Sequence, residues 1–123
     1  MINQKRGKRF ESDLKRKLKD RGYRVLKLAI PETADLVILN YKPIVIECKV
    51  TNRSLWYRAN TGQYLRLLEM HKEGYDVFIA VKFTSFKSII KFFRLDDVYP
   101  YSVNEGMSLS EFCFYLTNED MKK

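Results

Sequence analysis

Two short apolar runs separated by four turn-forming residues predict a β-hairpin in the first half of the chain. The runs span residues 35–39 and 44–50 and are rich in Val, Ile and Leu, and the sequence Asn-Tyr-Lys-Pro stands between them at residues 40–43. Because side chains alternate along a strand, the even-numbered residues of the second run share one face and the odd-numbered residues share the other. Glu47 and Lys49 therefore lie together on one face of an otherwise apolar strand.

A four-residue repeat of apolar side chains near the start of the chain predicts an amphipathic helix over residues 8–21. The repeat consists of Phe10, Leu14 and Leu18, and Gly22 follows as a helix stop. At about 100° per residue, Glu11 borders this apolar stripe, so its carboxylate is expected at the edge of the core.

The rest of the chain predicts an α/β domain with a central mixed β-sheet flanked by helices. Segment 52–60 is expected to be a polar loop, and segment 108–116 fits either a short helix or a strand. The other expected elements are a strand at 23–28, a helix at 61–74 and strands at 76–83 and 88–95. The order is therefore α-β-β-β-α-β-β, within a single domain of 123 residues.

Composition favours an intracellular globular protein. No apolar run approaches the roughly twenty residues that a membrane span needs, and the first residues lack the apolar core of a secretory signal. The two cysteines are too few for a disulfide framework. We therefore expect an intracellular setting and no membrane partner.

The positive charge of the chain is concentrated at its amino-terminal end. The formal net charge is +8, and residues 1–27 hold eleven Lys and Arg against three Asp and Glu, whereas the remainder holds twelve of each sign. Such a one-sided basic region is typical of a protein that binds a polyanion. Nucleic acid is favoured over anionic lipid, because the core uses the narrow apolar stripe of the first helix. A merely solvated helix face is the remaining alternative.

The carboxylates of the hairpin predict a divalent metal site. Asp35 begins the first strand, and antiparallel pairing brings it beside Glu47 in the second. Two buried carboxylates raise the pKa of at least one of them unless a cation neutralises the pair. Oxygen ligands without a His or Cys partner favour Mg²⁺ or Mn²⁺. Glu11 is a candidate third ligand, and Lys49 is placed to orient a nucleophile or to offset charge on a phosphate. The alternative is an edge strand with an ordinary Glu/Lys pair on its wet face, and a Glu11 that only flanks the stripe.

Four segments together resemble the archaeal Holliday junction resolvases of the PD-(D/E)xK nuclease superfamily. They are Gly7-Lys-Arg-Phe-Glu11, Asp35-Leu-Val-Ile-Leu, Ile46-Glu47-Cys-Lys49 and Gln63 in the following helix. The resemblance runs from about residue 7 to residue 95. It implies a restriction-endonuclease-like fold and a homodimer that cuts two opposed strands of a four-way DNA junction by metal-assisted hydrolysis.

The resemblance also implies a role for each residue of the site. Glu11, Asp35 and Glu47 would hold Mg²⁺, which Mn²⁺ can replace, with Lys49 as the catalytic lysine and Gln63 as a supporting residue. Residues 1–7 resemble a flexible basic arm that grips DNA. DNA contacts are expected from Lys5, Arg6, Lys8, Arg9, Lys27, Thr33, Arg53 and Arg58.

Three positions depart from the family pattern. Lys27 stands where the family often has Arg, which keeps the charge and loses the bidentate grip on phosphate. Thr33 is the only hydroxyl in a shortened loop that carries a Ser in the family. Ala34 replaces a usual Pro before Asp35. These changes concern the shape of the loop before Asp35 and its contacts with DNA.

Several alternatives stay open from the sequence. Another DNA nuclease of the same superfamily would keep the metal site, and a non-catalytic DNA-binding module would leave the carboxylates structural. Trp56 and Tyr57 are expected either to stack on DNA or to pack across a dimer interface. His71 is expected to be a partly exposed residue at the end of a helix.

Overall fold

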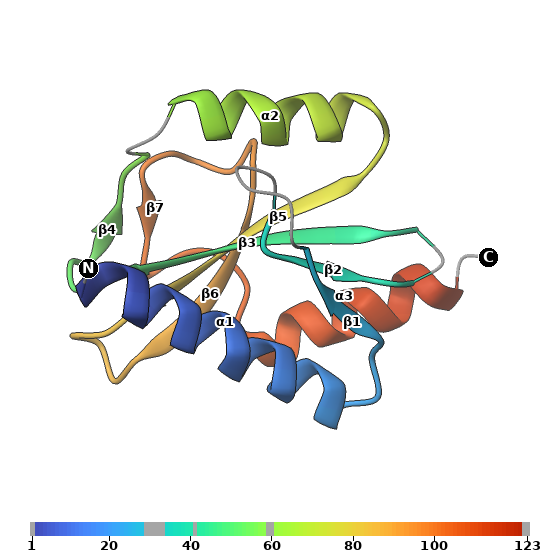
Figure 1. The fold of residues 1–123 in the computed structure, drawn as a ribbon, viewed down its shortest axis with the longest axis horizontal. Helices are drawn as coiled ribbons and strands as arrows, with labels where there is room; N and C mark the ends of the chain where they lie inside the picture. The colour runs from blue at the N-terminus through green and yellow to red at the C-terminus, as the bar shows by residue number, and fades with distance from the viewer. Residues whose placement is uncertain (1, 29–33, 41, 59–60, 122–123) are drawn as a thin grey trace.

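The structure, a computed structural model, describes residues 2–28, 34–40, 42–58 and 61–121. Its centre is a sheet of five strands in the order β1-β2-β3-β5-β6 (Figure 1). β3 and β5 are parallel, and the other neighbouring pairs are antiparallel. The strands are β1 (Val25–Lys27), β2 (Leu36–Ile38), β3 (Ile44–Thr51), β5 (Asp76–Phe83) and β6 (Ile89–Arg94). The predicted α/β fold with a mixed central sheet is therefore confirmed.

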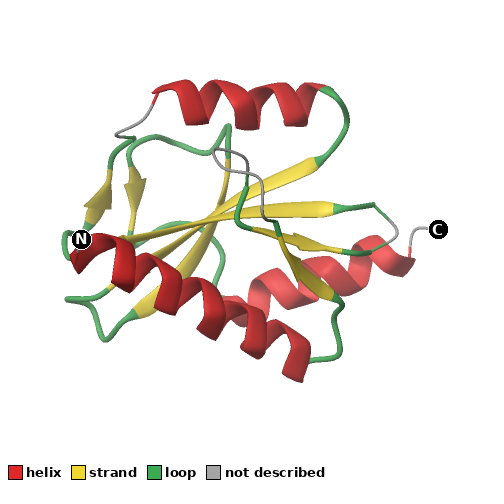
Figure 2. Cartoon of the chain, in the orientation of Figure 1, coloured by secondary structure: helices red, strands yellow, loops and turns green. Residues whose placement is uncertain are grey.

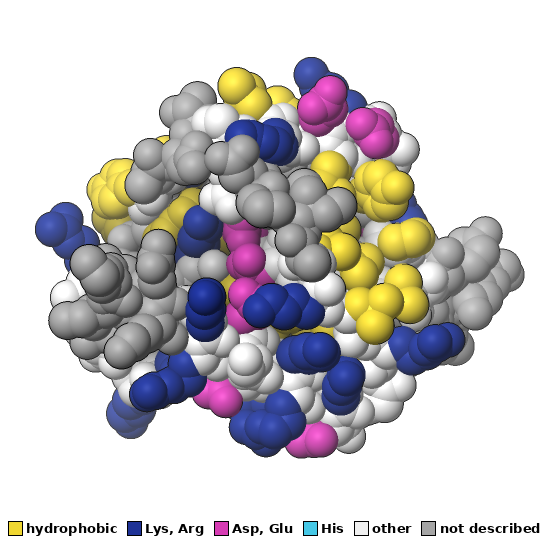
Figure 3. Space-filling view, in the orientation of Figure 1, with side chains coloured by type: hydrophobic (Ala, Val, Ile, Leu, Met, Phe, Trp, Pro, Cys, Tyr) yellow, Lys and Arg dark blue, Asp and Glu magenta, His cyan; other side chains and the backbone are white. Residues whose placement is uncertain are grey.

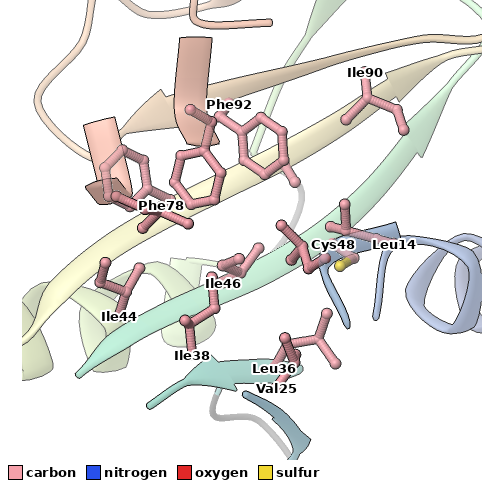
Figure 4. Close-up of a cluster of buried hydrophobic side chains, with 14 of the residues drawn as sticks. Leu14, Val25, Leu36, Ile38, Ile44, Ile46, Cys48, Phe78, Ile90 and Phe92 are labelled. Atoms are coloured by element: carbon pink, nitrogen blue, oxygen red, sulfur yellow. The ribbon is translucent and has the colours of Figure 1, made fainter. Parts of the chain in front are cut away.

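Helices cover both faces of this sheet (Figure 2). α1 (Ile2–Asp20) and α3 (Leu109–Met121) pack on one face, and α2 (Thr61–Lys72) packs on the other. The repeat Phe10, Leu14 and Leu18 of α1 is buried against even-numbered residues of β3, in the cluster of Figure 4. Among the described helices, none combines the length and the apolar character that a membrane span requires. The predicted faces of α1 and β3 are confirmed, so Glu47 points to the other face, toward α2.

Glycines end two of the helices, as the sequence predicts. Gly22 (φ 93°) and Gly74 (φ 101°) adopt the left-handed backbone that glycine tolerates best. Each glycine N–H donates back into the last helical turn, as Gly22 does to the carbonyl of Lys19 (2.9 Å). The start of α1 differs from the prediction, because the helix begins at Ile2 and includes the backbone of the segment expected as an arm. The flexibility of that segment stays a prediction.

A second, two-stranded sheet forms where a polar loop is expected. β4 (Leu55–Trp56) pairs with β7 (Tyr101–Ser102), so the expectation of a loop over 52–60 is wrong at these two residues. This small sheet lies on the same side of the main sheet as α2 (Figure 1). It brings the segment before α2 against the segment after β6.

Candidate active site

The five residues predicted to carry the chemistry line one cleft of about 610 Å³. They come from separate elements: Glu11 from α1, Asp35 from the residue before β2, Glu47 and Lys49 from β3, and Gln63 from the first turn of α2. Lys8 forms part of the wall on the α1 side. Figure 3 shows acidic side chains gathered at the centre of this face of the molecule, with Lys and Arg side chains on either side and along α1. This arrangement suits an anionic substrate that approaches a centre of carboxylates.

Backbone hydrogen bonds fix Asp35 beside Glu47. The Asp35 N–H donates to the Ile46 carbonyl (3.0 Å), and Asp35 Oδ2 accepts the Cys48 N–H (2.8 Å). Glu47 is only 2% exposed. Burial, a hydrogen bond with Asp35 and repulsion from Asp35 raise the pKa of Glu47 to about 9, although the nearby Lys49 and an amide hydrogen bond oppose this. In the absence of a cation, Glu47 therefore keeps its proton at neutral pH.

Gln63 joins the lysine to the carboxyl pair. Lys49 Nζ donates to Gln63 Oε1 (2.8 Å), and Gln63 Nε2 donates to Glu47 Oε2. Because the amide accepts from one partner and donates to the other, only one of its two orientations satisfies both. Gln63 therefore fixes Lys49 relative to Glu47, in keeping with the supporting role that the resemblance implies.

Glu11 lines the same cleft but is engaged elsewhere. It is 8% exposed, and its Oε1 lies 3.2 Å from Lys27 Nζ. Within the part of the chain that the structure describes, no three Asp, Glu, His or Cys side chains are grouped closely enough to hold a metal ion. Asp35 and Glu47 do fit a divalent cation, because they are paired oxygen donors and a bound cation would offset the burial and the Asp35 charge that raise the pKa of Glu47. Only Oε1 of Glu11 contacts Lys27, so its second carboxylate oxygen is the one left to join them.

Of the five predicted DNA contacts whose side chains the structure describes, four are exposed. The exposed members of this set are Lys8, Arg9, Lys27 and Arg53. Of these, Lys8 lines the cleft and Lys27 is paired with Glu11. Three further members have side chains outside the described residues, namely Lys5, Arg6 and Thr33.

Arg58 is half-buried in an aromatic cluster, unlike the four exposed residues of this set. Its guanidinium lies between the rings of Tyr64 and Tyr99, 3.9 Å from each ring centre. Beside it, Trp56 stacks on Tyr101 with ring centres 5.6 Å apart, so Trp56 packs within its own molecule. These contacts join segments far apart in the chain, and no local sequence pattern signals them.

A comparison with protein families bears directly on this site. The family model of the archaeal Holliday junction resolvases (Hjc) matches residues 2–117. The chain belongs to this family. Among solved structures, it is similar to the 1.6 Å structure of Hjc, a Holliday junction resolvase from the archaeal hyperthermophile Archaeoglobus fulgidus, with a TM-score of 0.65 and 20% sequence identity. That similarity covers 89% of this chain and 88% of the other, and it concerns the fold. No curated protein sequence matches the chain.

Membership of the Hjc family confirms the predicted resemblance, the restriction-endonuclease-like fold and the enzyme class. This Hjc chain is a Holliday junction resolvase, a nuclease of branched DNA, and nucleases of this family depend on a metal ion. The match extends to residue 117, beyond the region near residue 95 where the resemblance of the motifs ends.

Proposed function

We propose that this resolvase acts as a homodimer and cuts two opposed strands of a four-way DNA junction by Mg²⁺-dependent hydrolysis. The observation that carries the proposal is the pairing of the buried Glu47 with the half-buried Asp35 in a cleft bordered by basic residues. Two adjacent carboxyl groups, one of them buried, are costly for folding unless a proton or a cation neutralises the buried one. The pair is therefore better explained as a metal site than as part of the scaffold.

Mg²⁺ is the ion that the donor atoms suit best, and Mn²⁺ is expected to replace it. Asp35 and Glu47 offer hard oxygen ligands, and Glu11 stands in the same cleft as a third. When bound, the ion would supply positive charge that neutralises the carboxylates and stabilises charge on the reacting phosphate. Lys27, whose side chain is 57% exposed beside Glu11, is expected to contact a DNA phosphate.

The side chains of the cleft supply orientation and further positive charge. Lys49 is held by Gln63, so its ammonium is directed before the substrate arrives. In this position it orients the attacking water and offsets the charge that develops on the phosphate. Lys8 lines the cleft and Arg9 is exposed beside it on α1, so both are expected to bind phosphates that flank the reacting one.

Cleavage of a four-way junction and of a linear duplex of matched length tests the substrate. With Mg²⁺ we expect paired symmetric nicks in the junction and little cutting of the duplex, and with EDTA no cutting of either. Asp35→Asn should abolish cleavage of the junction and leave the affinity for the junction largely unchanged. Asp20→Asn removes an exposed carboxylate at the end of α1 and should change neither. Equal cutting of both substrates would instead indicate a general nuclease, and binding without any cleavage by the wild type would indicate a non-catalytic module.

Mixed dimers test the homodimer. If each subunit cuts one strand, a dimer of one wild-type and one Asp35→Asn subunit should nick a plasmid-borne cruciform without linearising it. Wild-type dimers should linearise the same plasmid. Sedimentation at the concentration of the assay should give twice the mass of the chain, and an active monomer would contradict the proposal.

A further inference from the structure

Arg58 is the centre of an aromatic clamp formed with Tyr64 and Tyr99. Its guanidinium carbon lies 3.9 Å from the centre of each ring, and its backbone N–H donates to the Tyr99 hydroxyl (2.6 Å). Its Nε is buried and makes no hydrogen bond to the residues that the structure describes. The guanidinium therefore interacts mainly by stacking on the two rings and by a side-chain hydrogen bond with Tyr101. Such stacking strengthens when the cation is removed from water.

The clamp adjoins the catalytic side chains. Tyr64 follows Gln63 in the first turn of α2. A small cavity of about 90 Å³ is lined both by Arg58 and Tyr64 of the clamp and by Lys49, Gln63 and Glu47. Gln63 is the residue that joins Lys49 to Glu47. Because neighbours on a helix move together, a shift of Tyr64 would also move Gln63.

We propose that Arg58 is a positioning residue for cleavage. Through the clamp, it ties Tyr99 in the segment after β6 to the first turn of α2, and so holds Gln63 against Lys49 and Glu47. A planar guanidinium presents two faces to two rings, which a lysine ammonium cannot do. The assignment rests on the proposed function, and it replaces the DNA contact that the sequence predicts for Arg58.

Arg58→Lys separates these two roles, because it keeps the charge and removes the planar faces. For a positioning residue, we expect the single-turnover cleavage rate of a saturated junction to fall at least about tenfold. The junction Kd should stay within about twofold of the wild type, since no phosphate contact is lost. The emission of Trp56, the only tryptophan and part of the wall of the same cavity, should also shift. Lys72→Ala, at the far end of α2, should change none of these.

Two further variants keep the test decisive if Arg58→Lys folds poorly. Tyr99→Phe keeps the ring and loses only the hydroxyl that accepts the Arg58 N–H, so its rate should fall less than that of Arg58→Lys. Tyr99→Leu removes the ring from the more exposed side of the clamp and should lose rate as Arg58→Lys does. An Arg58→Lys protein that cuts at the wild-type rate, with or without weaker binding, overturns the inference and leaves the proposed function intact. A wild-type protein that cuts no junction overturns both.

Discussion

Glu47 is a buried acid on an apolar strand, and its protonation depends on what else the cleft holds. Without a cation, burial and Asp35 raise its pKa to about 9. A divalent ion that binds Glu47 must therefore displace a proton at neutral pH. The alternation of β3 is enough to predict from the sequence that Glu47 and Lys49 share a face. The amide of Gln63 that joins them comes from another element, so its orientation follows only from the packing of α2.

Metal-free protein is expected to lose stability as the pH rises from about 5 to about 9. The ordinary pKa of Glu47, which applies in the unfolded chain, is 4.5, and that in the folded protein is about 9, so the folded state binds the extra proton across this window. Raising the pH favours the state with fewer bound protons, which here is the unfolded one. Urea unfolding in EDTA at several pH values should show that the free energy of unfolding falls as the pH rises. In Glu47→Gln this dependence on pH should be weaker. Equal slopes for both proteins would mean that Glu47 is not protonated when folded.

Lys49→Ala is expected to lower the single-turnover cleavage rate by at least about a hundredfold. Lys49 acts on charge that develops during the reaction, so the junction Kd should change little. Filter binding and quenched cleavage on the same junction measure the two quantities. Lys42→Ala, in the turn before β3, is the control and should leave the rate unchanged. A Lys49→Ala protein that binds weakly but cuts normally once bound would assign Lys49 to DNA binding instead.

At the scale of single elements, α3 shows that a helix cap can distinguish a helix from a strand where the apolar pattern fits both. Segment 108–116 is rich in aromatic residues, which suit a strand as well as a buried helix face. Ser108 Oγ accepts the Glu111 N–H (3.1 Å), and Glu111 Oε1 accepts the Ser108 N–H (2.9 Å). This capping box starts a helix, which then buries Phe112 and Leu116 four residues apart. The Ser-x-x-Glu spacing is visible in the sequence, so the cap predicts this helix better than the apolar residues do.

Ser108→Ala is expected to lower the free energy of unfolding by about 1 kcal/mol. The change removes the side-chain acceptor of the Glu111 N–H and leaves the rest of the helix in place. Urea unfolding measures the difference. Ser110→Ala is the matched control, because Ser110 is exposed within α3 and alanine favours a helix. Similar losses in both variants would show that the capping box contributes nothing.

At the scale of the whole molecule, the sequence predicts the main sheet and leaves the long-range packing open. Hairpins and apolar runs are local patterns, so β2, β3 and β5 are readily recognised. The pairing of β4 with β7 and the clamp around Arg58 depend on the path of the chain after β6. The ion pair between Glu11 and Lys27 likewise joins α1 to β1, and helix phase alone places only Glu11. The contacts around the five cleft residues are therefore less predictable from the sequence than the five residues themselves.

The charge of the whole molecule predicts how DNA binding responds to salt. Residues 1–27 carry the whole net charge of +8, and α1 exposes Lys8 and Arg9 near the cleft. Each phosphate contact contributes about 0.9 to the slope of log affinity against log salt concentration. Lys8→Ala/Arg9→Ala should therefore reduce that slope by about 1.8 and weaken junction binding. Gel shifts between about 50 and 200 mM salt measure both quantities.

Lys42→Ala/Lys72→Ala is the matched control for this double variant. It removes the same charge, from the turn before β3 and from the end of α2, at the ends of these elements away from Lys49 and Gln63. If only the total charge attracted DNA, both double variants would weaken binding alike, because the long-range field depends on net charge. If phosphates are bound beside the cleft, only the Lys8/Arg9 variant has a smaller slope of log affinity against log salt concentration. The reason is that counterions are released from a phosphate only where a cationic side chain contacts it. Equal slopes in the two variants would therefore mean that the basic end of the chain attracts DNA without holding it at the site.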